Sequence, residues 1–314
     1  MSSYSFNKDA PPQWDVVCQS GGALFHSRQW QALLEHSFAC QTLYGWNADT
    51  ESGAAITVFR AGPFKVGYLG FPVGGMVGNA IPDGTSILAW RHGPRTELPT
   101  CIRIAESAFA RPMNLPLPHE PNPETAIRNL QDWDLSSVSK NLRRDVKKAR
   151  RSNLSITPPK DAAEGSALFR IYRATVKNHG GALRYNEDYF SGLIKLAYHK
   201  SGLRILVARH QGNVAGFVIV GIHGKSSYYL HGGTDVAYRQ YSPADLLLSE
   251  AIQLARDTGS ECFNLMSSPN DQPSLVKYKE KWGGETRQHK TYTLAIKSSY
   301  YFFKIAEKLY RLRH

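Results

Sequence analysis

The segment with the most definite chemical potential lies in the last third of the chain. Ser242 followed by Pro243 is a strong helix start, because serine caps helices and proline fits their first turn. A helix N-terminus presents unpaired N–H donors and a partial positive charge, and Arg239 adds a full charge beside it. The segment therefore predicts an anion site, with a plain helix start as the alternative. Its residues are Arg239, Gln240, Tyr241, Ser242, Pro243 and Ala244.

A second candidate for anion binding is a basic helix predicted over residues 137–152. Ser139 can cap it, and Asp145 is the one acidic residue that offsets seven positive charges. This density favours binding of phosphates from a cofactor, a lipid-linked sugar or tRNA. A solvated helix face between two domains is the alternative. The cations are Lys140, Arg143, Arg144, Lys147, Lys148, Arg150 and Arg151, and the apolar stripe is Leu142, Val146 and Ala149.

Other chemistries lack their residues. The sequence has no HxxxH or HExxH pair for a metal and no GxSxG for a serine hydrolase. The cysteines are scattered without a CxxC pair, which predicts neither a zinc knuckle nor a disulfide framework. They are Cys18, Cys40, Cys101 and Cys262.

The order of elements after residue 153 is more informative than any single motif. Apolar spacing and turn residues predict a strand, two helices, three meander strands, a helix, a strand, a short helix and a last strand. The ranges are 154–157, 161–178, 187–199, 203–209, 214–222, 226–233, 243–258, 262–266, 272–282 and 291–296.

The first half repeats this order without repeating its residues. A helix is predicted first, then three strands, a helix, a strand, a helix and a strand. The ranges are 27–36, 41–46, 54–60, 65–71, 83–92, 101–105, 123–130 and 131–135. A topological duplication follows from the order alone.

This succession resembles the GNAT acyltransferase fold element for element. The resemblance implies an α/β protein of two tandem GNAT-like units, each a mixed, mostly antiparallel sheet flanked by helices. The expected division is a degenerate N-terminal unit over 1–136, a basic connecting helix over 137–152, an active GNAT unit over 153–297 and an amphipathic helix over 298–314.

Two motifs refine the resemblance. The family binds the cofactor pyrophosphate on a Q/R-x-x-G-x-G/A loop, which Arg239 and Ala244 match while Ser242 replaces the first glycine. Residues 137–153 and 262–284 are similar to segments of the FemAB branch and its acetyltransferase-like relatives. The sequence departs from that branch at Asn264 and Met266, where it usually has an aspartate and a glycine.

The resemblance also implies roles for single residues. A base must remove the proton of the acceptor amine, and His231, His179 and Asp235 are the candidates. The oxyanion donor is expected near Gly232-Gly233. Tyr278 is expected to act as general acid to the leaving thiolate, and Lys279 is expected to bind an anionic part of a substrate. The residues expected to contact the acceptor are His179, Arg184 and Tyr185, and those expected to bind phosphates are Arg143, Arg144 and Lys147.

Composition gives the setting. The 314 residues carry a net charge of +12, which implies an anionic partner. The N-terminus has no signal-peptide pattern and no apolar run reaches 18 residues, so we expect a cytoplasmic protein. Residues 298–314 predict a terminal helix packed on the protein, with peripheral attachment to the inner face of an anionic membrane as the alternative.

The sequence thus predicts an N-acyltransferase that moves an acyl group from acetyl-CoA or a longer acyl-CoA to an amine of a cell-envelope or polysaccharide precursor, small or lipid-linked, without a metal. Three alternatives stay open. One is an aminoacyl-tRNA-dependent FemAB-type transferase, favoured by the basic helix. Another is a non-catalytic binding protein, favoured by Ser242 and Asn264. The last is a general nucleic-acid binder, favoured by the net charge alone.

Overall fold

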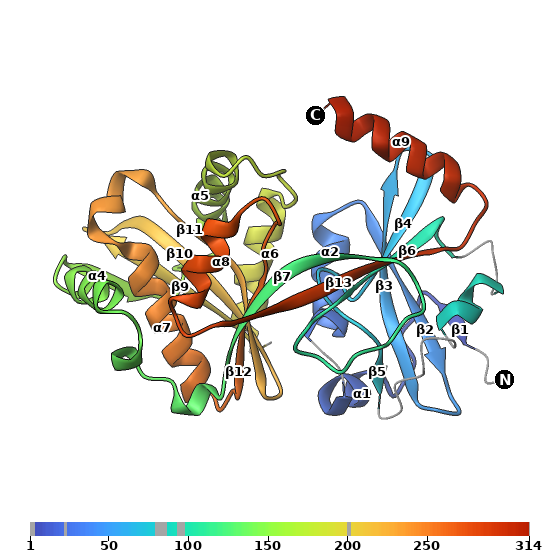
Figure 1. The fold of residues 1–314 in the computed structure, drawn as a ribbon, viewed down its shortest axis with the longest axis horizontal. Helices are drawn as coiled ribbons and strands as arrows, with labels where there is room; N and C mark the ends of the chain where they lie inside the picture. The colour runs from blue at the N-terminus through green and yellow to red at the C-terminus, as the bar shows by residue number, and fades with distance from the viewer. Residues whose placement is uncertain (1–3, 22–23, 79–86, 93–97, 200–201, 314) are drawn as a thin grey trace. The chain divides into compact units, whose positions relative to one another are not determined.

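The chain divides into two compact units, which we describe separately. The computed structural model describes residues 4–21, 24–78, 87–92, 98–199 and 202–313. Unit 1 comprises Met1–Asn122 and Gln288–His314, and unit 2 comprises Pro123–Arg287. The chain therefore passes from one unit to the other twice, once within β7 and once within β13 (Figure 1).

Unit 1 is built on a mixed sheet. Its strands neighbour one another in the order β1-β2-β3-β4-β6-β13, and β5 pairs with β3. The β4–β6 pair is parallel and the other pairs are antiparallel. The strands are β1 (Ser5–Asn7), β2 (Cys40–Asn47), β3 (Ser52–Ala61), β4 (Phe64–Leu69), β5 (Val77–Gly78), β6 (Cys101–Glu106) and β13 (Glu285–Ala295); the helices are α1 (Trp14–Gly21), α2 (Arg28–Ser37) and α9 (Tyr300–Arg313), with 3-10 turns at Leu24–His26 and Ala89–His92.

Helix α2 illustrates how the sequence builds this unit. Ser27 caps the helix by accepting a hydrogen bond from the backbone N–H of Trp30 at 3.2 Å. Trp30 and Leu34, one turn apart, are buried and so lie on the face that packs on the protein. The predicted helix and the three following strands are therefore confirmed.

Within unit 2 the strands neighbour one another in the order β7-β12-β11-β10-β9-β8, and of the described pairs β11–β12 is parallel while the others are antiparallel. Its strands are β7 (His119–Arg128), β8 (Leu154–Thr157), β9 (Leu203–His210), β10 (Asn213–His223), β11 (Ser226–Thr234) and β12 (Cys262–Ser267); its helices are α4 (Lys140–Arg150), α5 (Gly165–Asn178), α6 (Glu187–Tyr198), α7 (Pro243–Asp257) and α8 (Pro273–Glu280), with 3-10 turns η3 (Leu130–Asp132), η4 (Leu135–Ser137), η5 (Ala162–Glu164) and η6 (Val236–Tyr241).

Helices cover both faces of the unit 2 sheet. Successive side chains of a strand point to opposite faces. On one face of the sheet, Val218 and Val220 of β10 pack in one core with Leu247 of α7. On the opposite face, the ring of Phe217 lies 5.9 Å from that of Phe190 on α6. All ten elements predicted after residue 153 are present.

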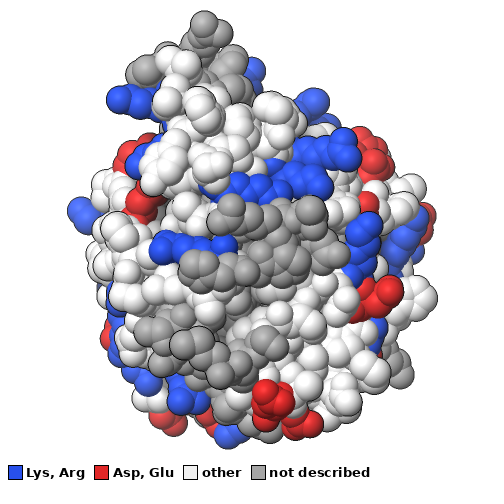
Figure 2. All heavy atoms as spheres, turned by 90° about the vertical axis from the view of Figure 1, so that its right-hand side faces the viewer, with Lys and Arg blue, Asp and Glu red and all other residues white. Residues whose placement is uncertain are grey.

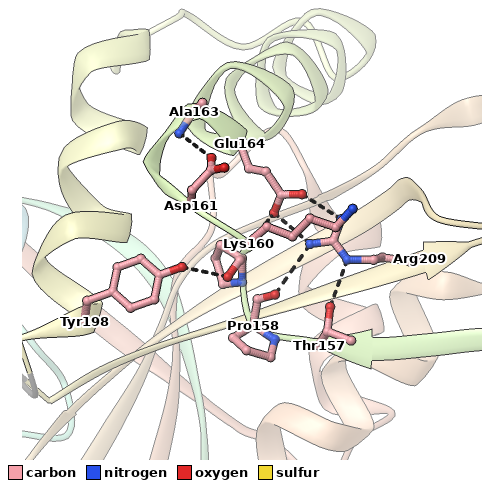
Figure 3. A network of polar contacts seen from close by, with 9 residues as sticks. Thr157, Pro158, Lys160, Asp161, Ala163, Glu164, Tyr198 and Arg209 are labelled. Carbon is pink, nitrogen blue, oxygen red and sulfur yellow. Dashed lines mark hydrogen bonds and ion pairs between the residues drawn. The ribbon is translucent and has the colours of Figure 1, made fainter.

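A buried ion pair fixes the corner where β8 meets η5 (Figure 3). Arg209, near the end of β9, donates to both carboxylate oxygens of Glu164 at 2.7 Å and to the Thr157 hydroxyl at 2.8 Å. The adjacent hydroxyl of Tyr198, on α6, donates to the Pro159 carbonyl at 2.7 Å. These bonds tie the segment that leads into α5 to the sheet and to α6.

The observed division differs from the predicted one. Residues 123–136 and the basic helix α4 belong to unit 2, while residues 288–297 belong to unit 1. The predicted helix over 123–130 is the end of strand β7, because this segment pairs with β12 and sheet pairing overrides local helix propensity. The predicted strand around 131–135 is made of 3-10 turns. The predicted helix over 83–92 lies partly outside the described residues.

Candidate functional site

The site in unit 2 begins where two parallel strands part. β11 and β12 are paired only from Ser226–Tyr228 to Cys262–Asn264, although β11 runs on to Thr234. Beyond Asn264, the backbone of Met266 has a positive φ of 64°, and the pairing of β12 with β7 loses its register. The edge of β11 from Tyr229 onward therefore has no β12 partner, and a free edge can pair with an extended ligand.

A bulge lies on this free stretch of β11. Ile219 is opposite His231 and Val220 is opposite Tyr229, so Leu230 is the extra residue. The Tyr229 side chain lies against Gly232 of the same strand, since a Cβ on Gly232 would lie 1.9 Å from the Tyr229 hydroxyl. A Cβ on Gly233 would lie 2.8 Å from the Thr175 hydroxyl. The two glycines thus permit close packing of Tyr229 and of α5.

The N-terminus of α7 lies at the same end of the strands, because α7 is the crossover between parallel strands β11 and β12. Ser242 precedes the helix with φ 54° and ψ 46° and makes no side-chain cap. The side chain of Ser242 therefore does not cap the first-turn N–H groups, and anion binding at this helix end stays a prediction. Arg239 and Gln240 are exposed beside it, as is Ala244.

The rest of the predicted loop is the turn η6. Asp235 caps η6 by accepting from the Ala237 N–H at 3.0 Å. The Tyr241 ring stacks on His210 of β9 with centroids 4.4 Å apart. This stacking holds the end of η6 against the sheet just before Ser242.

Tyr278 of α8 faces this helix end. Its hydroxyl donates to Asp245, in the first turn of α7, at 3.0 Å. Burial and the nearby Asp245 charge hold the pKa of Tyr278 well above its usual value, so the phenol keeps its proton. Burial likewise raises the pKa of Asp245, although the Tyr278 hydrogen bond opposes this. The sequence interpretation had not singled out Asp245; its place two residues after Pro243 was the available signal.

Lys279, the next residue, holds the end of β12. Its ammonium donates to the Met266 carbonyl at 2.8 Å and to the Ser268 hydroxyl at 2.8 Å. Burial lowers the pKa of Lys279 to about 7, and the Glu124 carboxylate opposes the shift. Asn264 in turn donates to Glu124 at 2.7 Å. The buried lysine therefore lies beside the opening, the place where β11 and β12 part. Glu124 interacts both with the charge of Lys279 and, through a hydrogen bond, with Asn264.

His231 lies in an aromatic cage on the α5 and α6 side. Its Nε2 is 3.1 Å from the Tyr189 hydroxyl, and its ring centroid is 4.6 Å from that of Tyr185. Tyr172 and Phe190 complete the cage. Burial lowers the pKa of His231 to about 3, so the imidazole is neutral at physiological pH.

The other predicted acceptor residues are spread around this cage. Tyr185 is part of it, and burial raises the pKa of its phenol. His179 and Arg184 are exposed in the α5–α6 connection. Asp235 forms an ion pair with Arg170 at 2.9 Å, and its pKa is lowered because bonds from the Ala237 N–H and Arg170 outweigh its burial.

The basic helix α4 covers α7. Its apolar stripe, including Leu142 and Val146, enters the same core as α7, and Arg150 pairs with Glu250 of α7 at 3.1 Å. Arg143, Arg144 and Lys147 are exposed on the opposite side. The predicted helix, cap and apolar stripe are therefore confirmed, as part of unit 2.

The described residues contain no cluster of His, Cys, Asp and Glu able to hold a metal ion. Within the same ranges, no helix combines the length and apolar character needed to cross a bilayer.

Comparison with known proteins places unit 2 in a family. Residues 136–280 match the model of the acetyltransferase (GNAT) domain. This segment belongs to the GNAT family, and the chain therefore carries an acyltransferase domain, as predicted. The sequence matches no curated protein.

Solved structures of other proteins share the fold of most of the chain. The chain is similar to FemX, with 11% identity, a TM-score of 0.63 and coverage of 91% of this chain and 96% of that one. It is also similar to L-PGS, a lysyl-phosphatidylglycerol synthetase, from Bacillus licheniformis, with 14% identity, a TM-score of 0.63 and coverage of 94% and 95%. A tandem GNAT protein from the clavulanic acid pathway aligns with 11% identity, a TM-score of 0.51 and coverage of 83% and 84%. The predicted fold of two tandem GNAT-like units is confirmed.

Proposed function

We propose that unit 2 transfers an acyl group from acyl-CoA to an amine. The observation that carries the proposal is the parting of β11 and β12 directly beside the N-terminus of α7. An acyl-CoA has phosphates for the helix end and amides for a free strand edge, at opposite ends of one extended chain. The donor phosphates are assigned to the N–H groups after Ser242 and to Arg239, with Gln240, Tyr241 and Ala244 forming the loop.

The reaction needs a donor for the oxyanion and a proton for the leaving thiolate. In the proposed reaction the amine attacks the thioester carbon, the C–N bond forms and the C–S bond breaks. Backbone N–H groups of the free β11 stretch donate hydrogen bonds to the developing oxyanion. Tyr278 gives its proton to the thiolate, the amine loses its proton to solvent, and Tyr278 takes a proton back from solvent. Tyr278 is assigned this role because its raised pKa keeps the phenol protonated before the reaction and because Asp245 holds its hydroxyl at the first turn of α7.

His231 and Asp235 receive positioning roles rather than the role of base. The low pKa of His231 makes it a weak proton acceptor, so we assign it to the wall of the acceptor pocket together with Tyr185. Asp235 is assigned to hold η6 through Arg170. The exposed His179 and Arg184 are assigned to the acceptor.

The acceptor is proposed to be an amine on a cell-envelope or polysaccharide precursor, either small or lipid-linked. The similarity of the whole chain to FemX and to a lysyl-phosphatidylglycerol synthetase supports this class. Lys279 is assigned to an anionic group of the bound substrate, because its ammonium lies at the end of β12 beside the opening.

A second candidate donor is an aminoacyl-tRNA. The exposed cations of α4, with Arg143, Arg144 and Lys147 among them, favour it, since such a face attracts a phosphate backbone. Asp245 in the first turn of α7 also adds an acidic group near the site assigned to the CoA phosphates.

Calorimetry with purified protein separates these donors. We expect acetyl-CoA or a longer acyl-CoA to bind, and an Arg239→Ala, Ser242→Asp variant to bind at least about tenfold more weakly, because a charge-assisted hydrogen bond contributes about 1.5–3 kcal/mol. The matched control is Arg60→Ala, which removes an exposed arginine of unit 1. Binding of charged tRNA without binding of any CoA ester assigns the aminoacyl reaction. Failure of both donors to bind leaves a non-catalytic binding protein.

A further inference from the structure

One side of helix α9 attaches the helix to unit 1. Phe303 is buried against Val66 and Cys101, and its ring lies 5.6 Å from that of Phe64. One turn later, Glu307 accepts a hydrogen bond from Arg103 of β6. Positions 303 and 307 lie on the same face of a helix, so this stripe accounts for the attachment.

The opposite side of α9 exposes large apolar side chains. Tyr301 is 71% exposed, Phe302 70%, Ile305 60% and Leu309 55%. The spacing of 301, 305 and 309 is one turn each, which places them on one face with Phe302 beside them. These residues are four of the eight strongly exposed large hydrophobic residues among the described ones, the others being Val16, Leu183, Tyr198 and Val236. Their concentration on one helix marks an interaction surface.

Positive charge accompanies this surface. Lys304 and Lys308 are exposed between the apolar residues, and the acidic residue of this helix, Glu307, is bound to Arg103. Lys297 lies three residues before the helix begins. Its pKa is lowered by burial and, second, by the charge of Lys65, so two further ammonium groups lie near each other. In Figure 2 the helix forms the projection at the top, largely white, with Lys and Arg at its base.

We propose that α9 docks unit 1 onto the anionic lipid surface of a bilayer. A helix with an apolar face and interleaved lysines lies in the interface plane, with the apolar side chains in the acyl region and the ammonium groups at the headgroups. A second copy of the chain is a poorer occupant, because a two-fold contact sets the Lys304 and Lys308 of each copy against those of the other. This proposal is independent of the acyl donor.

Vesicle co-sedimentation of the full chain tests the proposal. We expect binding to phosphatidylglycerol-containing vesicles and little binding to phosphatidylcholine alone. A Lys304→Glu, Lys308→Glu variant is expected to bind at least about 25-fold more weakly, since each lysine near an anionic surface contributes about fivefold. The matched control, Lys8→Glu with Lys195→Glu, makes the same change in net charge at exposed positions outside α9.

The apolar face is tested separately. Phe302→Ser with Ile305→Ser is expected to abolish vesicle binding, whereas Val16→Ser, at an equally exposed valine, leaves it unchanged. All these side chains are exposed, so the variants retain the fold, which circular dichroism checks. Equal vesicle binding by the α9 variants and their controls overturns the proposal. So does a concentration-dependent dimer in solution that the Phe302→Ser, Ile305→Ser variant loses.

Discussion

Replacing Glu164 by glutamine removes one charge from the network that joins η5, β8 and β9 (Figure 3). The side chains of Arg209 and Glu164 are 6% and 15% exposed, and two bonds of 2.7 Å join them. Breaking a buried ion pair by removing one partner costs about 3–5 kcal/mol, because the other charge stays buried. Glu164 keeps some contact with solvent, so we expect the lower end of that range, about 3 kcal/mol.

Denaturation of the variant measures this cost. A loss of about 3 kcal/mol lowers the midpoint of thermal unfolding of unit 2 by roughly 6–12 °C for a unit of this size. Glu261→Gln is the control, because Glu261 pairs with Lys225 on the surface and such a pair contributes at most about 1 kcal/mol. The reasoning is refuted when Glu164→Gln lowers the midpoint no more than Glu261→Gln does.

The same variant has a defined pH dependence. Burial raises the pKa of Glu164, but hydrogen bonds from Arg209 and from the Lys160 N–H outweigh it, so the pKa is lowered overall. A carboxyl with a lowered folded-state pKa contributes stability that is complete above its unfolded pKa of about 4.3 and is lost as the pH falls through the folded value. The stability difference between the native chain and Glu164→Gln is therefore expected to be constant from pH 7 to 5 and to shrink below about pH 4.

Three further predictions concern the site. Lys279 has a pKa of about 7 in the folded chain instead of 10.5, so folding releases its proton. From pH 7 to 9 the free energy of unfolding of the native chain should therefore rise by about 2 kcal/mol relative to that of Lys279→Met, as measured by urea titration. His231 has a pKa of about 3 in the folded chain, so it stays neutral at pH values where the unfolded chain binds a proton. From pH 6.5 to 5 the free energy of unfolding of the native chain should therefore fall by about 1.5 kcal/mol relative to that of His231→Gln. A difference between the two chains that does not change with pH contradicts the burial of His231 in the aromatic cage. Tyr278→Phe is expected to lower kcat of acyl transfer by about 10²–10⁴-fold with little change in KM, measured with the assigned donor and set against Tyr198→Phe as a control outside the opening.

Much of the fold was predictable because its signals are local. The strand Leu154–Thr157 and the helix start at Ser242-Pro243 are encoded by neighbouring residues. Strand β7 was mistaken for a helix, because its conformation depends on pairing with β12, more than 130 residues later in the chain. Most of β13 belongs to unit 1 instead of the predicted second unit, and this likewise depends on a distant partner, strand β6.

The candidate site was predictable in part. Composition and spacing identified Arg239 and the loop before α7, and the family resemblance identified Tyr278 and Lys279. The partners of these residues were not predictable, because Asp245 lies 33 positions before Tyr278 and Glu124 lies 140 before Asn264. The bulge at Leu230 has no local signature, since it exists only relative to the register of β10.

The most direct test of the central claim is deuterium exchange of the native chain with and without saturating acetyl-CoA. We expect slower exchange in two segments, the free β11 stretch at 229–234 and the first turn of α7 at 243–246, with no change in α4. Unchanged exchange in both segments, or protection confined to α4 when charged tRNA is supplied instead, would contradict the claim.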